Sequence, residues 1–336
     1  TDHGVMYGAI EFYEKCKKEG IKPIIGVEAY LASGSRHERT VRPGEKNYHH
    51  LVLLAKNNTG YHNLVKLTSI AHTEGYYYKP RIDWAVLSQH AEGVIATSSC
   101  LAGEIPRLLM AGKREKALER LDDYCRLFGE GNFFIDLQDH PEIPEQMQLN
   151  DQLIEIARER DLPLIVTNDV HYLRSEDDEA QDILLCLQNK SKKEDTNRMC
   201  MLGVNYSLKP GAAIAKAFAH VPDAIENTLK LADMCNVELE LGKIQLPYFE
   251  VPEGYDGNSF LRKLALEGFV KRYGKTYEEM DEVYRVRLDY ELEVVAKMGW
   301  PSYFLIVADF VNWAKDQGII VGPGRGSAAG SLVCFL

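Results

Sequence analysis

Asp169 and His171 lie two residues apart, directly after a short apolar run in the stretch LPLIVTNDVHY at residues 162–172. The run at 164–166 is bounded by turn-forming residues, which predicts a buried strand. In extended backbone, the spacing of Asp169 and His171 puts both side chains on the same side. A carboxylate and an imidazole at a strand end suit a site for Zn²⁺, Mn²⁺ or Mg²⁺. A capped strand end with a surface histidine is the simpler alternative.

This strand belongs to an alternation of helix and strand patterns that runs from residue 5 to about residue 190. Apolar runs predict further strands at 22–31, 49–55, 93–99 and 132–138. Helical spacing predicts helices at 5–20, 59–72, 113–128, 145–160 and 175–190. Gly20 is expected to follow the end of the first helix, and Ser175 to be the N-cap of the last. The short connections predict an α/β fold with a mainly parallel sheet and favour a barrel.

Other strand ends carry residues of the same chemical types. In a parallel barrel the carboxyl ends of the strands meet on one face, where side chains from several strands converge. The candidate ligands beside Asp169 and His171 are His3, Glu28, His50 and Cys100. His50 fits this placement less well, because it begins its apolar run. A mixed His, Asp, Glu and Cys set suits several metal ions bridged by a carboxylate, with a metal-bound water that attacks phosphorus.

Each candidate also has an ordinary structural interpretation. Cys100 could be a small core residue, since free cysteine is commonly buried. His49 and His50 could face solvent and core without any metal, and Glu28 could be held by a lysine. The metal hypothesis is preferred, because the ordinary interpretations would require all of these residues to occur together in one fold by coincidence.

Composition sets further limits. The chain of 336 residues is 45% hydrophobic and 26% charged, which is typical of a globular protein large enough for two domains. No apolar run is long enough for a membrane span. Seven cysteines without a CxxC pair indicate a reducing, cytoplasmic setting. The net charge of −11 makes the whole chain a poor general binder of phosphate backbones. The abrupt ends, at Thr1 and Leu336, predict a piece of a longer protein.

Several long motifs in order resemble a known family. The stretches at 1–32, 49–69, 76–83, 98–106 and 167–172 are similar to the PHP (polymerase and histidinol phosphatase) domain of the bacterial DNA polymerase III alpha subunits, the C-family replicative polymerases. The resemblance covers residues 1–245 and implies a distorted (β/α) barrel. The resemblance implies that all six candidates are metal ligands. It also implies that Asp2 contacts a ligand without binding the metal itself. The family's first HxH motif is absent, so part of a three-metal site is expected here.

The far end of the chain carries a glycine-rich stretch, GIIVGPGRGSAAGSL at 318–332, after a predicted linker at 246–258. Glycines let backbone N–H groups approach an anion, Arg325 adds a fork of donors, and Ser327 could cap a helix over 327–336 whose dipole favours a triphosphate. A glycine turn with a surface arginine is the alternative. The candidate nucleotide-binding residues are Gly324, Arg325, Gly326 and Ser327.

This stretch also resembles the same family, at the start of a palm domain similar to the α+β nucleotidyltransferase palm of polymerase β. The palm is expected over 259–336. The resemblance places the paired catalytic carboxylates farther along, in a PDxD-type motif. Asp309 and Asp316 are no substitute, because both fall within a helical pattern, so this segment is not expected to polymerise by itself.

The resemblance implies a DNA-directed DNA polymerase that extends primed DNA with dNTPs and uses Mg²⁺ for polymerisation. The PHP domain would then add metal-dependent phosphoester hydrolysis, conceivably 3′–5′ removal of mispaired nucleotides. The implied partners are a sliding clamp, a clamp loader and a proofreading exonuclease subunit, without a membrane. Two alternatives stay open: a free-standing PHP phosphoesterase, and a PHP domain that is only a structural or docking platform.

Overall fold

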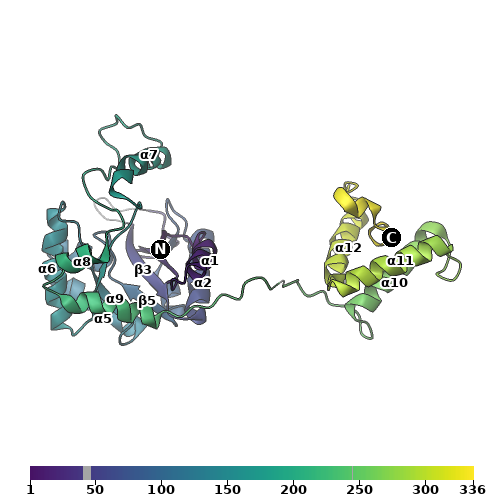
Figure 1. Ribbon diagram of the computed structural model, residues 1–336, viewed down its shortest axis with the longest axis horizontal. Coiled ribbons are helices and arrows are strands. Elements are labelled where there is room, and N and C mark those ends of the chain that lie inside the picture. The colour runs from purple at the N-terminus through teal and green to yellow at the C-terminus, as the bar shows by residue number, and fades with distance from the viewer. Residues whose placement is uncertain (41–46, 244) are drawn as a thin grey trace. The chain divides into compact units, whose positions relative to one another are not determined.

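The computed structural model describes residues 1–40, 47–243 and 245–336. The chain forms two compact units, Thr1–Leu239 and Glu240–Leu336, and each is described by itself (Figure 1). The finer limits predicted from the sequence, with a linker over 246–258, stay a prediction.

The first unit is built around a sheet that has seven strands among the described residues. They pair in the order β1-β2-β3-β5-β6-β7, and β4 pairs with β2. Their bounds are β1 (Asp2–His3), β2 (Gly26–Ala32), β3 (Tyr48–Ala55), β4 (Arg81–Ile82), β5 (Val94–Thr97), β6 (Phe133–Gln138) and β7 (Leu164–Thr167). Every strand predicted from an apolar run is present.

One strand runs against its neighbours. The pairs β1–β2, β2–β4, β5–β6 and β6–β7 are parallel, whereas β3 is antiparallel to both β2 and β5. Within the described residues the pairings form an open path from β1 to β7 instead of a regular ring. The predicted α/β class with a distorted barrel is confirmed, and β3 is the exception to the parallel sheet.

Most helices of this unit surround the sheet, whereas α7 lies in a segment that projects away from it (Figure 1). Their bounds are α1 (Ala9–Lys18), α2 (Asn58–Thr73), α3 (Trp84–Gln89), α4 (Glu104–Met110), α5 (Arg114–Phe128), α6 (Pro144–Glu159), α7 (Asp178–Asn189), α8 (Gly211–Ala217) and α9 (Pro222–Met234). Strands β5 and β6 are buried along their whole length. Helices α2 and α6 each turn an apolar face to this core, with Leu64 and Leu67 of α2 and Leu153 of α6. This core holds the strand ends in fixed positions.

Two helix ends test the sequence analysis directly. Gly20 follows the end of α1 with φ +70°, a conformation that glycine adopts without strain, so this prediction is confirmed. The prediction that Ser175 caps its helix is wrong. Ser175 starts a 3₁₀ turn, Ser175–Asp177, and Asp177 is the N-cap residue of α7. The Asp177 carboxylate accepts the Arg174 N–H at 2.9 Å, which tightens the chain into that turn first.

Among the described residues of the second unit, helices are the only regular elements. The unit contains α10 (Gly257–Tyr273), α11 (Glu282–Lys297), α12 (Pro301–Asp316), a 3₁₀ turn (Gly326–Gly330) and α13 (Leu332–Phe335). Leu261, Phe269, Leu288 and Leu305 form its core. Between α10 and α11 the Glu279 carboxylate accepts the Thr276 N–H at 2.9 Å and closes a separate turn, and α11 begins at Glu282.

The predicted continuous helix over 327–336 is also wrong. Ser331 has an extended backbone, with φ −87° and ψ 126°, and separates the 3₁₀ turn from α13. Among the described residues, no single helix is long and apolar enough to cross a membrane; α11 and α12 meet that test only together, with a bend of 113° between them.

Candidate metal centre and nucleotide loop

The predicted metal ligands gather at one edge of the sheet. They come from separate strands or the loops that follow them: His3 from β1, Glu28 from β2, His50 from β3, Cys100 after β5, and Asp169 and His171 after β7. Ligand atoms of Glu28, His50 and Cys100 all lie within 4.8 Å of one another. The ring centroids of His3 and His171 are 5.7 Å apart, so His171 lies beside the group that contains His3 and Glu28.

Glu28 is the centre of this cluster and is 6% exposed. Its Oε2 pairs with His3 Nδ1, and its Oε1 accepts from His50 Nδ1 at 2.9 Å and from Ser99 Oγ at 3.2 Å. Burial opposes ionisation, but the hydrogen bonds from His3 and His50 outweigh it and hold the pKa of the Glu28 carboxyl far below its ordinary value. The same bond raises the pKa of His3. A carboxylate with its two oxygens engaged on opposite sides is suited to bridge two metal ions.

His50 belongs to the cluster because β3 is antiparallel. In the β2–β3 register His50 lies opposite Tyr30, and Val52 lies opposite Glu28. The start of β3 therefore lies beside the end of β2, at the edge where the parallel strands finish. From the sequence, His50 fitted the site less well because it begins its strand. That objection holds only if all the strands are parallel.

A tight turn after β5 brings Cys100 to Glu28. Ser99 has φ +62°, an unfavourable conformation for a residue other than glycine. Gly103 N–H then donates to the Cys100 carbonyl at 2.8 Å, and a Cβ on Gly103 would lie 2.2 Å from the Ser98 carbonyl oxygen. The Cys100 sulfur lies 3.5 Å from His50 Nδ1 and 3.8 Å from Glu28 Oε1. Burial raises the pKa of the Cys100 thiol to about 12.

Asp169 and His171 reach the cluster through a turn, not through the extended backbone that the sequence predicted. Strand β7 already ends at Thr167, and Asp169 has φ +44°. His171 Nδ1 lies 2.8 Å from the Asp169 carbonyl oxygen. Donation from Nδ1 to this oxygen leaves the lone pair on Nε2 available for a metal. Burial raises the pKa of the Asp169 carboxyl.

Two further groups lie at this edge that were not predicted from the sequence, Asp136 in β6 and His140 just after it. Asp136 accepts the hydroxyl of Thr167 at 2.7 Å and that of Thr97 at 3.1 Å, and burial raises its pKa to about 7. His140 Nε2 lies 4.0 Å from Asp169 Oδ2. The signal was available, because QDH follows an apolar run as NDVH does, but only the latter was used.

The donors that the structure brings together are a carboxylate, imidazoles and a thiol, a set that fits a borderline divalent ion. Buried polar atoms without a partner support this fit, since they include both ring nitrogens of His140 and Oδ1 of Asn168, next to Asp169. The Asp2 side chain makes no hydrogen bond to a predicted ligand within the described residues, so its supporting role stays a prediction.

The predicted nucleotide-binding residues form an exposed loop. Gly324 and Gly326 have φ +79° and +70°, values that need glycine, and they leave Arg325 extended between them. Arg325 and Ser327 are both exposed. The described part of the chain gives Arg325 no ion pair, so its guanidinium is available to an anion.

The sequence predicted that the helix after this loop would offer its N-terminus to a phosphate. The structure shows that this end of the helix is already occupied. The Glu291 carboxylate accepts the N–H of Leu332 at 3.1 Å and that of Val333 at 2.9 Å, and the Ser331 hydroxyl at 2.8 Å. An anion of the protein itself therefore occupies this end of α13. Ser331, not Ser327, caps the helix by accepting the Cys334 N–H.

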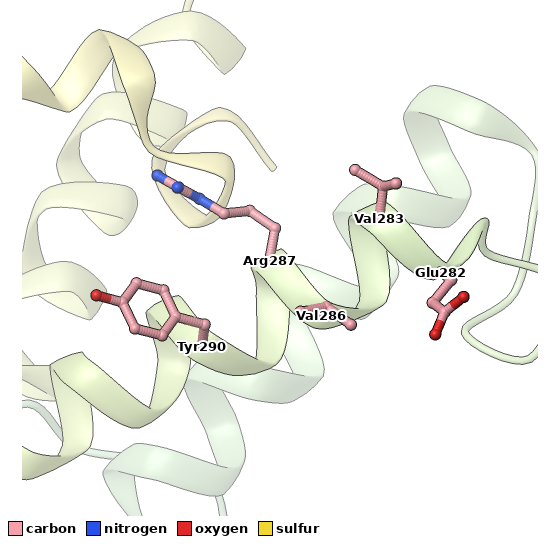
Figure 2. A pocket seen from close by; sticks show the side chains of 5 residues that line it. All are labelled: Glu282, Val283, Val286, Arg287 and Tyr290. Carbon is pink, nitrogen blue, oxygen red and sulfur yellow. The ribbon is translucent and has the colours of Figure 1, made fainter.

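A surface depression lies on α11 in the second unit. It is lined by Glu282, Val283, Val286, Arg287 and Tyr290, all from one helix (Figure 2). Arg287 reaches from it toward the C-terminal segment, where its guanidinium donates to the Gly330 carbonyl at 3.4 Å (Figure 2). With one helix as its lining, the depression holds no convergent set of catalytic groups.

Comparison with known proteins defines the class of both units. Residues 1–140 match the PHP domain family, and residues 259–336 match the bacterial DNA polymerase III alpha NTPase domain. A PHP domain together with the Glu28, His50 and Cys100 donors indicates divalent metal ions at this site.

Whole-chain relatives agree with these matches. The chain is 45% identical over 336 residues to DNA polymerase III subunit alpha of Treponema pallidum, 42% identical over 337 residues to that of Borreliella burgdorferi, and 38% identical over 395 residues to that of Thermus aquaticus. Each alignment covers 100% of this chain and 28%, 29% and 32% of the respective relative. The chain belongs to the family of bacterial DNA polymerase III alpha subunits, and it spans less than a third of their length.

Proposed function

We propose that this chain is part of a DNA-directed DNA polymerase that adds dNTPs to a primed DNA template. The observation that carries the proposal is the similarity of the whole chain to DNA polymerase III alpha subunits, at 38–45% identity. A free-standing PHP phosphoesterase would not need the polymerase NTPase segment at 259–336. That segment favours the polymerase over the alternative.

In this function Gly324, Arg325, Gly326 and Ser327 contact the incoming triphosphate. The two glycines with positive φ expose backbone N–H groups, and the Arg325 guanidinium can form two parallel hydrogen bonds to phosphate oxygens. Glu291 closes the N-terminus of α13, so the triphosphate has to bind on the loop itself. The carboxylates that hold the two Mg²⁺ ions of polymerisation belong to the downstream PDxD-type motif.

The PHP unit forms a second, metal-dependent site in this proposal. His3, Glu28, His50, Cys100, Asp169 and His171 hold Zn²⁺, Mn²⁺ or Mg²⁺, and Asp2 supports a ligand from behind. A bound ion would supply an activated water for phosphoester hydrolysis. Glu28 orients two imidazoles, and the Asp169 carbonyl fixes His171 with Nε2 free. The substrate we propose is a mispaired primer end, trimmed in the 3′–5′ direction.

The whole protein acts in the bacterial cytoplasm on primed DNA and dNTPs. Its partners in this proposal are a sliding clamp, a clamp loader and a proofreading exonuclease subunit. The support is the name that the relatives carry, since each is a subunit of DNA polymerase III.

The polymerase proposal is tested by primer extension with the full-length protein. Arg325→Ala is expected to raise the KM for dNTPs by about 10-fold or more, because hydrogen bonds to charged groups contribute about 1.5–3 kcal/mol. Lys315→Ala, another cation of the same unit in the last turn of α12, is the matched control and should leave extension unchanged. Equal KM values for the Arg325→Ala variant and the wild type would remove Arg325 from the triphosphate site. A wild-type protein without any primer extension would refute the function itself.

A further inference from the structure

The tyrosine loop, residues 76–80 between α2 and β4, holds an exposed aromatic ring on an unfavourable backbone. Tyr78 has φ +60° and is 77% exposed, and its ring meets that of Tyr77 edge-on with centroids 4.6 Å apart. A positive φ is uncommon for any residue other than glycine and is an outlier for a bulky one. Strain of this kind is concentrated at functional sites. Packing does not explain Tyr78, because most of its side chain is in solvent.

A buried arginine holds the tyrosine loop in place. Arg81 is 2% exposed, and its Nε donates to the Gly75 carbonyl at 3.1 Å. Its Nη2 donates to the carbonyls of Arg36 and Glu38 at 2.9 Å and 2.8 Å. A Cβ on Gly75 would lie 1.9 Å from the Arg81 carbonyl oxygen, so the two ends of the loop are in close contact. The loop is therefore fixed before any ligand binds.

The tyrosine loop borders the metal centre. Gly4 follows His3 in the chain, and a Cβ at Gly4 would lie 2.8 Å from Pro80 Cγ. The same Cβ would lie 2.8 Å from Tyr30 Cε2. The Tyr30 ring is stacked with that of His3, with centroids 6.5 Å apart, and Lys79 Nζ lies 5.5 Å from the centroid of Tyr30. Tyr30 is thus a common neighbour of the Lys79 ammonium and a predicted metal ligand.

Lys79 has no anionic partner within the described part of the chain. Its side chain contacts the Tyr30 ring and makes no hydrogen bond or ion pair there. Lys209 of the same unit, in contrast, donates to the Asp139 carboxylate at 2.9 Å. An ammonium group offers three donors, and contact with a ring face leaves them available to an anion. A phosphate that reaches the metal centre would find this cation beside it.

We propose that the tyrosine loop positions the end of the DNA strand that the metal centre cleaves. Lys79 donates to a backbone phosphate, and the Tyr78 ring stacks on an unpaired base. The inference rests on the phosphoester hydrolysis of the proposed function and adds the residues that hold its substrate. Every base has a face that can stack, so any mispaired end is accepted. A correctly paired end keeps its bases stacked in the duplex, so the loop selects mispaired ends.

The test measures trimming by the full-length protein on two primers, one with a mispaired single-stranded 3′ end and one fully paired. Lys79→Ala and Tyr78→Ala should each raise the KM for the mispaired primer by about 10-fold, with kcat and metal content unchanged. Tyr78→Phe should match the wild type, because stacking needs only the ring. Lys116→Ala, an exposed lysine of α5, is the control and should also match it.

Two further measurements separate substrate binding from a merely structural role. Tyr78→Ala should lose the preference of the wild type for the mispaired primer over the paired one. Tyr78→Gly relieves the positive φ, so it should unfold at the wild-type temperature or above and still show the raised KM.

Two outcomes contradict the inference in different ways. Unchanged KM and unchanged preference in Lys79→Ala and Tyr78→Ala would overturn it, while trimming by the wild type would leave the hydrolysis at the metal centre intact. Absence of trimming by the wild type would overturn both the inference and that hydrolysis.

Discussion

His50 Nδ1 donates to Glu28 Oε1 at 2.9 Å across two antiparallel strands. This contact joins His50, near the start of β3, to a carboxylate in the first half of β2. It exists because β3 reverses the direction of the sheet. On the other side of β2, Glu28 pairs with His3 of the parallel strand β1.

Replacing the central carboxylate should remove the metal and weaken the fold. The Glu28→Gln variant has an amide N–H₂ where His3 or His50 now donates, which leaves a buried donor unpaired at a cost of about 1–3 kcal/mol. Metal analysis and denaturant unfolding measure the two effects. Glu104→Gln is the matched control, because among the described residues the Glu104 carboxylate bonds to Arg120 and Tyr124 and to none of the predicted ligands. The Glu104→Gln variant is expected to lose stability but to keep its full metal content. If Glu28→Gln also kept its full metal content, the prediction would be contradicted.

The turn that carries Cys100 should not tolerate a larger residue at Gly103. In Gly103→Ala the new Cβ would lie 2.2 Å from the Ser98 carbonyl oxygen, so the backbone must move. We expect a loss of about 1–3 kcal/mol in the free energy of unfolding, together with weaker metal binding. Gly211→Ala is the control, because nothing lies within 4 Å of its added Cβ. Equal unfolding curves for the two variants would show that the turn adapts freely.

Asp136 should make the metal-free protein less stable as the pH rises. Burial raises its folded pKa from 3.8 to about 7, so the folded state binds the proton more tightly than the unfolded state. The stability it contributes is complete below pH 3.8 and is lost as the pH rises toward 7. Asp136→Asn should flatten this dependence. Unfolding curves of both proteins between pH 4 and pH 8, in a chelator, measure it, and parallel curves would count against the prediction.

Glu291 should hold the segment after the nucleotide loop in place. Burial raises its pKa, but the N–H groups of Val333 and Leu332 and the Ser331 hydroxyl outweigh this and lower it. Its stabilising effect is therefore present above pH 4.5 and is lost as the pH falls through the lowered folded pKa.

Amide hydrogen exchange tests this anchor directly. In Glu291→Ala the N–H groups of Leu332 and Val333 should exchange about 10-fold faster, which corresponds to about 1.4 kcal/mol. Glu282→Gln, at the start of the same helix, is the control. Unchanged exchange in Glu291→Ala would mean that α13 is held by its apolar contacts alone.

Local patterns were enough to predict most elements and most of the site. The apolar run at 164–166 became β7, and Gly20 ends α1 as its conformational freedom suggests. Strand direction could not be predicted in this way, because whether β3 runs with or against β2 depends on how the chain returns to the sheet. That is why the position of His50 was doubtful in the sequence and clear in the structure.

Other errors have equally specific causes. The turn at Asp169 was read as extended backbone, since the sequence pattern of a strand does not show where the strand stops. The helix expected over 327–336 breaks at Ser331. There the Ser331 hydroxyl and the Leu332 N–H donate to Glu291, forty residues earlier in the chain, which a local sequence pattern does not show. His140 was not predicted, although QDH follows its apolar run in the same way as NDVH follows the run at 164–166.

The central claim is that the PHP unit is a working metal site in a polymerase. The most direct measurement is elemental analysis of the full-length protein, with a nuclease assay on a mispaired primer end, for the wild type and for Asp169→Ala combined with His171→Ala. We predict bound divalent metal and trimming in the wild type, and the loss of both in the variant. Metal without trimming in the wild type, and weakened primer extension in the variant, would contradict the catalytic role and make the unit a structural brace.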